Sequence, residues 1–105
     1  MTMGYVYIQE QYHYNGWSYC DVVGDKRFNI AILEPYWIDP NGDKWSNCDV
    51  SDLYESDAEW VDADPAGYWV MDYRKEEPWE DMKEFKTREE GLKYLEQIAK
   101  EYNNQ

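Results

Sequence analysis

Carboxylate side chains are the groups in this sequence whose type and spacing point most directly to a function. Between Trp45 and Tyr73 the chain carries eight aspartates and glutamates and neither lysine nor arginine. Residues 39–81 hold 14 of the 23 acids but only three of the ten bases, whereas acids and bases balance over residues 82–105. Like charges crowded together repel one another, which costs electrostatic free energy. A net charge of −13 concentrated in this way therefore indicates a surface that binds a positively charged partner.

The spacing of these acids is comparable to the spacing of phosphates along a nucleic acid. Over residues 49–64 a carboxylate recurs every two or three positions, which corresponds to roughly 6–10 Å in an extended chain. Duplex DNA carries one charge per ~1.7 Å of helix axis, so this segment is expected to fit a groove that binds a phosphate backbone. The expected phosphate mimics are Asp49, Asp52, Glu55, Asp57, Glu59, Asp62 and Asp64, and the expected aromatic anchors, which would stack on arginine, are Tyr54 and Trp60. The alternative is a solvated acidic surface that only keeps the chain soluble.

A calcium site is the next candidate. Asp39, Asn41 and Asp43 alternate along the chain as the first ligands of an EF-hand loop do. Lys44 stands where that loop needs glycine, and Val50 stands where it needs a bidentate glutamate. We therefore predict a hairpin turn at this segment and no metal site.

Catalytic groups are scarce. His13 is the only histidine, so a Ser–His or Cys–His nucleophile would have to use it. Its place between two tyrosines on a predicted strand favours a surface or ring-stacked role instead. The spacing of Cys20 and Cys48 matches no metal-binding or redox motif, and the sequence leaves open whether the two form a disulfide. We expect no enzymatic activity and no cofactor.

Aromatic residues must supply much of the core that positions these groups. Leu, Ile, Val and Phe number only 17, whereas the chain has six Trp and eleven Tyr, and an enclosed aromatic ring buries roughly 150–250 Å². The 105 residues are expected to form a single domain, residues 1–105. Because neither a signal peptide nor an apolar stretch of membrane length is visible, we expect a cytoplasmic protein.

The first predicted elements are two strands joined by a tight turn. Residues 5–14 alternate in polarity, Asn15-Gly16 favours a type I′ turn, and residues 17–23 form the returning strand. The expected opposing pairs are Tyr14 with Trp17, Tyr12 with Tyr19, Glu10 with Asp21 and Ile8 with Val23. Two carboxylates directly opposite each other weaken a ladder. The sequence favours a bulge or register shift that separates Glu10 from Asp21 over a cation supplied from outside.

One face of the first strand offers a second mode of binding. Its members are Tyr5, Tyr7, Gln9, Gln11 and His13. Such a polar-aromatic platform stacks on sugars or on protein partners. If the helix covers this face, however, the rings belong to the core, and the shortage of aliphatic residues favours the core for most of them.

Further strands and turns follow along the chain. Residues 28–33 are predicted to form a third strand. The segments Asp39-Pro40-Asn41-Gly42 and Asp64-Pro65-Ala66-Gly67 both have proline second and glycine fourth, the preference of a type I turn. Since aromatic and aliphatic residues flank both turns, we predict two more hairpins.

One helix is predicted at the C-terminal end. Thr87 and Glu90 form a capping box, and apolar residues then recur at helical spacing as far as Tyr102. Gly91 is a weak point inside this helix. A helix over residues 87–102 with one apolar face needs a sheet to cover. The predicted fold is therefore α+β, an antiparallel sheet of about five to seven short strands, over about residues 4–73, with one helix packed on one face.

In size and charge layout the chain resembles the small, acidic, aromatic-rich proteins with which bacteriophages and mobile elements block host defence. These include DNA-mimicking anti-restriction and anti-CRISPR proteins. The resemblance rests on residues 39–81. It implies a non-enzymatic inhibitor that docks its acidic face on the basic groove of a nucleic-acid-binding protein, such as a nuclease or defence effector. We expect no direct binding of nucleic acid, because phosphates are repelled by the net charge, and no membrane partner.

Two alternatives to this inhibitor stay open. Acidic immunity proteins that neutralise basic nuclease toxins have the same size and charge layout. A glycan- or small-ligand-binding β domain would instead use the Tyr5–His13 face. Salt discriminates between them, because charge-driven binding weakens steeply as ionic strength rises and ring stacking barely responds.

Overall fold

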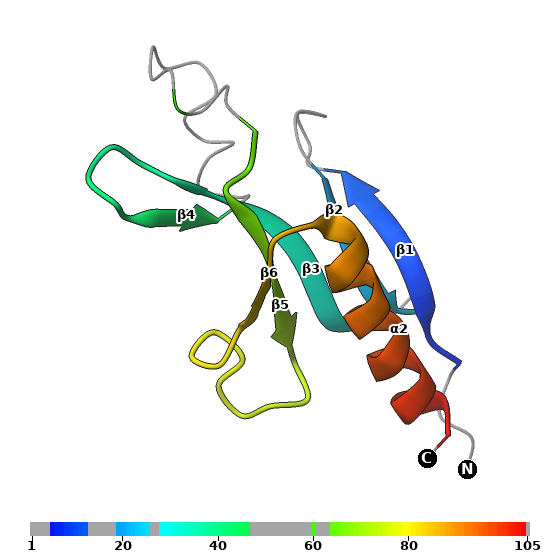
Figure 1. Ribbon diagram of the computed structural model, residues 1–105. Helices are drawn as coiled ribbons and strands as arrows, with labels where there is room; N and C mark the ends of the chain where they lie inside the picture. The colour runs from blue at the N-terminus through cyan, green and yellow to red at the C-terminus, as the bar shows by residue number, and fades with distance from the viewer. Residues whose placement is uncertain (1–4, 13–18, 26–27, 47–59, 61–63, 105) are drawn as a thin grey trace.

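The computed structural model describes residues 5–12, 19–25, 28–46, 60 and 64–104, and over these residues the chain forms an antiparallel sheet with one helix across one face (Figure 1). The sheet order is β1-β2-β3-β5-β6, and β4 pairs with β3 off this path. The elements are β1 (Tyr7–Tyr12), β2 (Tyr19–Gly24), β3 (Asn29–Ile38), β4 (Lys44–Ser46), β5 (Gly67–Asp72), β6 (Lys83–Phe85) and α2 (Arg88–Asn103). This is the α+β architecture that the sequence predicts.

The β1–β2 hairpin has the predicted register. Ile8 lies opposite Val23, Glu10 opposite Asp21 and Tyr12 opposite Tyr19. The Asn15-Gly16 turn and the expected pair of Tyr14 with Trp17 lie outside the described residues. The ladder of this hairpin runs without a shift, and the irregularity found in β2 falls between Val23 and Gly24, where β2 pairs with β3.

The predicted bulge between Glu10 and Asp21 is therefore wrong. The two carboxylates are opposite each other, and Arg88 at the start of α2 bridges them. Arg88 Nη2 donates to Glu10 Oε1 and to Asp21 Oδ1 over 2.8 Å each, and its Nε donates to Asp21 Oδ2 over 2.9 Å. The neutralising cation comes from within the chain, 67 residues beyond Asp21.

The central strand β3 runs beyond the predicted third strand and continues through Pro35 to Ile38. One edge of β3 pairs with β5, from Ala31 to Tyr36. The other edge pairs first with β2, as far as Leu33, and then with β4, from Tyr36 onward. Pro35 lies between these two partners, where a residue without an N–H group costs the ladder little.

The hairpins predicted at the two Asp-Pro turns have different outcomes. The first closes the predicted hairpin between β3 and β4: Asp39 Oδ1 accepts from the backbone N–H groups of Asn41 and Asp43 at 2.9 Å, and Gly42 has a φ of 89°. The second does not close a hairpin, so that prediction is wrong. β5 pairs on its two sides with β3 and β6, and the N–H of Ala66 donates to the Tyr36 carbonyl.

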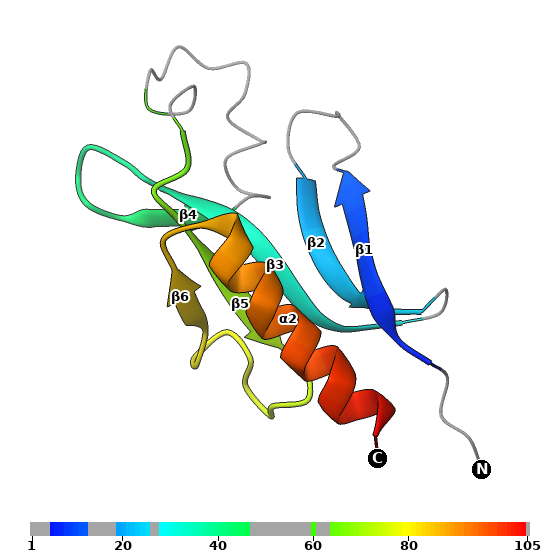
Figure 2. The same ribbon diagram turned by 45° about the vertical axis from the view of Figure 1, so that its right-hand side comes forward.

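Helix α2 covers one face of the sheet, as both views show (Figures 1 and 2). Thr87 is its N-cap and accepts from the N–H of Glu90, as the capping box predicts. The core between helix and sheet consists of Val6, Val23, Ile30, Ala31, Leu33, Val70, Leu95, Ile98 and Tyr102. Gly91 lies against Leu33 so closely that a Cβ atom at Gly91 would be 2.4 Å from Leu33 Cδ1. The helical glycine permits this contact between helix and sheet.

The face of β1 that carries Tyr5 and Tyr7 points away from the helix. Val6, on the helix side, is fully buried and donates its N–H to Asn103 Oδ1 of α2. Tyr5 is 72 % exposed and Tyr7 is 41 % exposed. The expectation that these rings belong to the core is therefore wrong for both tyrosines. His13 of the same predicted face lies outside the described residues.

Candidate functional site

The acidic segment that the sequence singles out leaves the sheet at the end of β4 and returns to it at the start of β5. Most of its expected contact residues lie outside the described residues: Asp49, Asp52, Tyr54, Glu55, Asp57, Glu59 and Asp62. The two that are described are Asp64, which is exposed, and Trp60, which is half-buried. The Trp60 ring lies 5.5 Å from the ring of Trp45, and Trp45 donates its indole N–H to Asp39 Oδ2. Trp60 therefore packs against a side chain of the β3–β4 hairpin.

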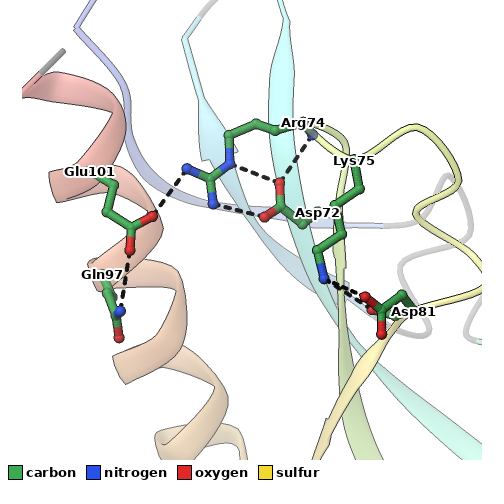
Figure 3. A network of polar contacts seen from close by, with 6 residues as sticks. All are labelled: Asp72, Arg74, Lys75, Asp81, Gln97 and Glu101. Carbon is green, nitrogen blue, oxygen red and sulfur yellow. Dashed lines mark hydrogen bonds and ion pairs between the residues drawn. The ribbon is translucent and has the colours of Figure 1, made fainter.

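All three bases of residues 39–81 are ion-paired. Lys44 Nζ lies 2.8 Å from Glu84 Oε1, and Lys75 Nζ lies 2.9 Å from Asp81 Oδ2. Arg74 pairs with Asp72 and with Glu101 (Figure 3). Each of these positive charges is already paired with a carboxylate of the same chain. The excess negative charge of residues 39–81 therefore acts on other molecules that approach this surface.

The Asp72–Arg74 pair joins the end of β5 to the helix. The Arg74 guanidinium donates from Nε and Nη2 to the two carboxylate oxygens of Asp72, at 2.9 and 2.7 Å, and from Nη1 to Glu101 Oε2 of α2 at 3.2 Å (Figure 3). Burial on its own raises the pKa of Asp72, but the hydrogen bonds from the Arg74 side chain and backbone outweigh it, so the pKa lies below its ordinary value.

A second polar cluster lies where β3, β4 and β6 meet. Lys44 Nζ lies 5.2 Å from the centroid of the Tyr36 ring as well as beside Glu84. Burial, and then the hydrogen bond to Glu84, raise the pKa of Tyr36. Hydrogen bonds from Lys44 and Tyr36 lower the pKa of Glu84. Glu84 is thus held in its ionised form by two neighbours.

The sheet face away from the helix carries an aromatic hollow, a cavity of about 330 Å³. Strand alternation places Glu34 and Trp69 on this face, because their neighbours Leu33 and Val70 belong to the core under the helix. The lining residues are Ile32, Glu34, Ser46, Trp69, Met71, Tyr73, Trp79 and Met82. They come from β3, β4, β5 and the loop of residues 73–82, which joins β5 to β6 (Figure 1).

Glu34 is a buried carboxylate in the aromatic hollow. It is only 7 % exposed, and its Oε1 accepts the indole N–H of Trp69 over 2.8 Å. The Trp69 ring stacks on Tyr36 with a centroid distance of 4.6 Å. Gly67 makes room for this stack, because a Cβ at that position would lie 2.7 Å from the Tyr36 hydroxyl oxygen. The rings and the backbone together fix where the carboxylate lies.

Sequence reasoning missed the aromatic hollow. The available signal is a single acid, Glu34, in the middle of an otherwise apolar strand sequence, since burying a charge is costly and occurs mainly where a specific partner is present. Trp79 is 62 % exposed although tryptophan is usually enclosed, but this exposure is visible only in the structure and gives no signal in the sequence.

Comparisons with known proteins give no relative. No protein-family model, no curated protein and no solved structure matches the chain. Within the described ranges, no helix has the length and apolar character that crossing a membrane requires.

Proposed function

We propose that the protein is a non-enzymatic inhibitor that places its acidic segment, residues 49–64, in the basic groove of a nucleic-acid-binding protein. The target class is a nuclease or defence effector, and the biological setting is the one implied by the resemblance to phage proteins that block restriction or CRISPR systems. One observation carries the proposal: the chain has eight acids and no base between Trp45 and Tyr73. It is supported by the pairing of Lys44, Arg74 and Lys75 with carboxylates of this chain.

The mechanism is occupation of a phosphate-binding surface. Carboxylates spaced every two or three residues attract the lysine and arginine side chains that otherwise hold a phosphate backbone. The long-range field of a chain with net charge −13 steers the encounter. Trp60 and Tyr54 add stacking against arginine. Inhibition then requires no chemical step, because nucleic acid cannot enter a groove that is already filled.

An immunity protein against a basic nuclease toxin would use the same acidic segment in the same way. The two possibilities differ only in which basic protein is recognised, so the identity of the captured partner separates them.

A glycan- or small-ligand-binding function is the second candidate, and the exposure of Tyr5 and Tyr7 favours it. Both rings lie on the sheet face that α2 does not cover, where they are accessible for stacking. This candidate predicts binding that changes little between low and high salt.

Affinity capture from bacterial lysate tests the proposed function. The native chain should recover a nucleic-acid-binding protein at low salt and lose it at high salt. A variant with Asp52, Glu55, Asp57 and Glu59 changed to lysine should recover none. Equal recovery by the native chain and this variant would contradict the proposal.

A matched pair of variants controls for net charge. The Asp57→Lys/Glu59→Lys variant and the Glu89→Lys/Glu96→Lys variant change the net charge equally, but the second pair lies at exposed positions of α2. The proposal predicts that only the first pair weakens capture strongly. Equal weakening by both would indicate attraction by net charge alone.

A further inference from the structure

We propose that a cleft between β6 and α2 binds a small organic anion, one carboxylate or phosphate group on a ring or a short apolar body. The cleft, which we call the lysine cleft, has a volume of about 290 Å³. The inference goes beyond the proposed function, because the site uses neither residues 49–64 nor the aromatic hollow. The residues that line the lysine cleft are Lys83, Phe85, Glu90, Lys93, Tyr94 and Gln97.

The fold brings the two sides of the lysine cleft together. Strand alternation directs Lys83 and Phe85 toward the helix, because their partners on β5, Val70 and Tyr68, pack in or against the core under α2. On α2, positions 90, 93, 94 and 97 are three or four residues apart and therefore share one stripe of the helix surface. Strand β6 and helix α2 are in contact (Figure 2), so the stripe faces the strand across the cleft.

Two half-buried rings supply the apolar part of the lining. Phe85 and Tyr94 both pack against the core, and their ring centroids lie 5.6 Å apart. Because the core holds these rings in place, a ligand need not order them when it binds. Small-molecule sites usually measure roughly 300–1,000 Å³, so the lysine cleft suits a ligand the size of one ring with one charged group.

Two lysines give the cleft its positive charge. Lys83 Nζ lies 5.0 Å from the centroid of the Tyr94 ring, and since the ring is neutral this contact leaves the ammonium charge uncompensated. Among the residues that the structure describes, neither Lys83 nor Lys93 forms an ion pair, although the chain has 23 acids and ten bases. The bases that pair with carboxylates are Lys44, Arg74, Lys75 and Arg88. Two ammonium groups that lack a carboxylate partner and line one cleft carry the inference.

The charge of the lining is positive, although the charge of the chain is negative. Two lysines and one glutamate, Glu90, give the lining a net charge of +1, against −13 for the whole chain. The Glu90 carboxylate belongs to the capping box, where its Oε1 accepts from the Thr87 hydroxyl at 3.2 Å. Exposed charges act over roughly 10 Å at 0.1 M salt. An anion in the cleft therefore responds mainly to the lining.

The lining favours an anion that carries an apolar body. Ammonium groups bind carboxylate and phosphate oxygens through charge-assisted hydrogen bonds, and a cationic ligand would be repelled. An inorganic anion would leave the rings of Phe85 and Tyr94 in water, whereas an apolar body covers them and the aliphatic stems of the lysines. The ligand class is therefore the aromatic or short-chain carboxylates and phosphate monoesters.

The test uses the full ¹⁵N-labelled chain and follows its backbone amide resonances by NMR. The probes are phenyl phosphate and phenylacetate, and the comparison compounds are uncharged benzyl alcohol and inorganic phosphate. Resonances of residues 83–85 and 90–97 should shift saturably with at least one probe, with a Kd in the millimolar range. The tighter probe identifies the anionic group.

Both comparison compounds should bind at least about tenfold more weakly than the tighter probe, because one lacks the charge and the other lacks the ring. Equal binding of either comparison compound, or no saturable shift with either probe, would overturn the inference.

Two lysine variants and one control localise the binding. Lys83 and Lys93 are exposed, so the fold is retained when either is changed to glutamine. Lys83→Gln and Lys93→Gln should each weaken binding of the tighter probe about threefold to tenfold. Lys100→Gln makes the same change of charge at an exposed helix position outside the lining and should leave the Kd unchanged. An unchanged Kd in either cleft variant would contradict the inference.

A change of the opposite sign completes the test. Glu90→Gln keeps the capping box, which accepts glutamine as well as glutamate, and removes the negative charge of the lining. Binding of the tighter probe should become about twofold to fivefold tighter. Asp64→Asn, at an exposed position outside the lining, is the control for net charge and should leave the Kd unchanged. Weaker or unchanged binding in Glu90→Gln would argue against an anion held in this cleft.

Discussion

Arg88 and Asp21 form a bidentate ion pair between the first residue of α2 and the middle of β2. Arg88 Nε and Nη2 lie 2.9 and 2.8 Å from the two carboxylate oxygens of Asp21, which is only 3 % exposed. The same Nη2 reaches Glu10 on β1. One guanidinium therefore holds the start of the helix over the β1–β2 hairpin and neutralises two opposing carboxylates that would otherwise weaken it.

Removing this cation should destabilise the fold. Arg88→Gln leaves the Asp21 charge buried without its partner. We expect the free energy of unfolding to fall by about 2–4 kcal/mol. This loss is smaller than the largest values for buried ion pairs, because Arg88 is partly exposed. Urea denaturation measures the loss, with Lys93→Gln at an exposed helix position as the control. Adding Asp21→Asn to Arg88→Gln should recover part of it. A loss below about 0.5 kcal/mol in Arg88→Gln would show that the pair does not stabilise the fold.

Gly91→Ala should fail to stabilise the helix. Replacing an exposed helical glycine by alanine gains up to about 1 kcal/mol. Here the added Cβ would lie 2.4 Å from Leu33 Cδ1, and Leu33 is 1 % exposed in the core, so we expect overpacking to cost about 1–3 kcal/mol instead. Combining Gly91→Ala with Leu33→Val should cost less than the sum of the two single changes. Stabilisation by Gly91→Ala alone would contradict the close approach of helix and sheet.

Asp72 should make the stability depend on pH in the acidic range. The pKa of Asp72 is lower in the folded chain than in the unfolded chain. Its contribution to the free energy of unfolding is therefore complete at pH values above the unfolded pKa of ~3.9. That contribution is lost as the pH falls through the lower pKa of the folded chain. We expect Asp72→Asn to lower the free energy of unfolding by about 1–3 kcal/mol at pH 7. The difference between variant and native chain should shrink below about pH 4. Asp64→Asn, an equal change of charge at an exposed position, is the control and should show neither effect.

Added salt should raise the melting temperature at pH 7. The acid excess of residues 39–81 repels itself, and salt shortens the range of that repulsion from roughly 10 Å at 0.1 M to about 3 Å at 1 M. The variant with four acids of residues 52–59 changed to lysine should gain less from sodium chloride than the native chain. A melting temperature that falls with salt would argue against a crowded acidic surface.

Local patterns were enough to predict much of the fold. The Asn-Gly turn and the strand alternation gave the β1–β2 register, and the capping box of Thr87 and Glu90 gave the start of α2 to within one residue. Strand β6 was missed, because its three residues, Lys-Glu-Phe, carry too little pattern to distinguish a strand from a loop. The predicted hairpin at Asp64-Pro65 failed because both edges of β5 are already paired, one with β3 and the other with β6.

The long-range contacts of single side chains lay beyond sequence reasoning. Nothing near Glu10 or Asp21 indicates that Arg88 neutralises them, because the contact depends on how the helix crosses the sheet. The aromatic hollow likewise requires β3, β5 and the loop of residues 73–82 to converge. The acidic segment differs from these contacts, because its composition is evident in the sequence. The function proposed for it is still a prediction.

Competition with nucleic acid is the measurement that tests the central claim most directly. A basic protein captured by the native chain is incubated with labelled duplex DNA, and the bound fraction is followed as the native chain is added. Phosphate mimicry predicts stoichiometric displacement of the DNA, which weakens steeply with salt and disappears when Asp52, Glu55, Asp57 and Glu59 are changed to lysine. If the captured protein keeps its DNA at saturating concentrations of the native chain, the acidic segment does not occupy the groove and the proposed function is wrong.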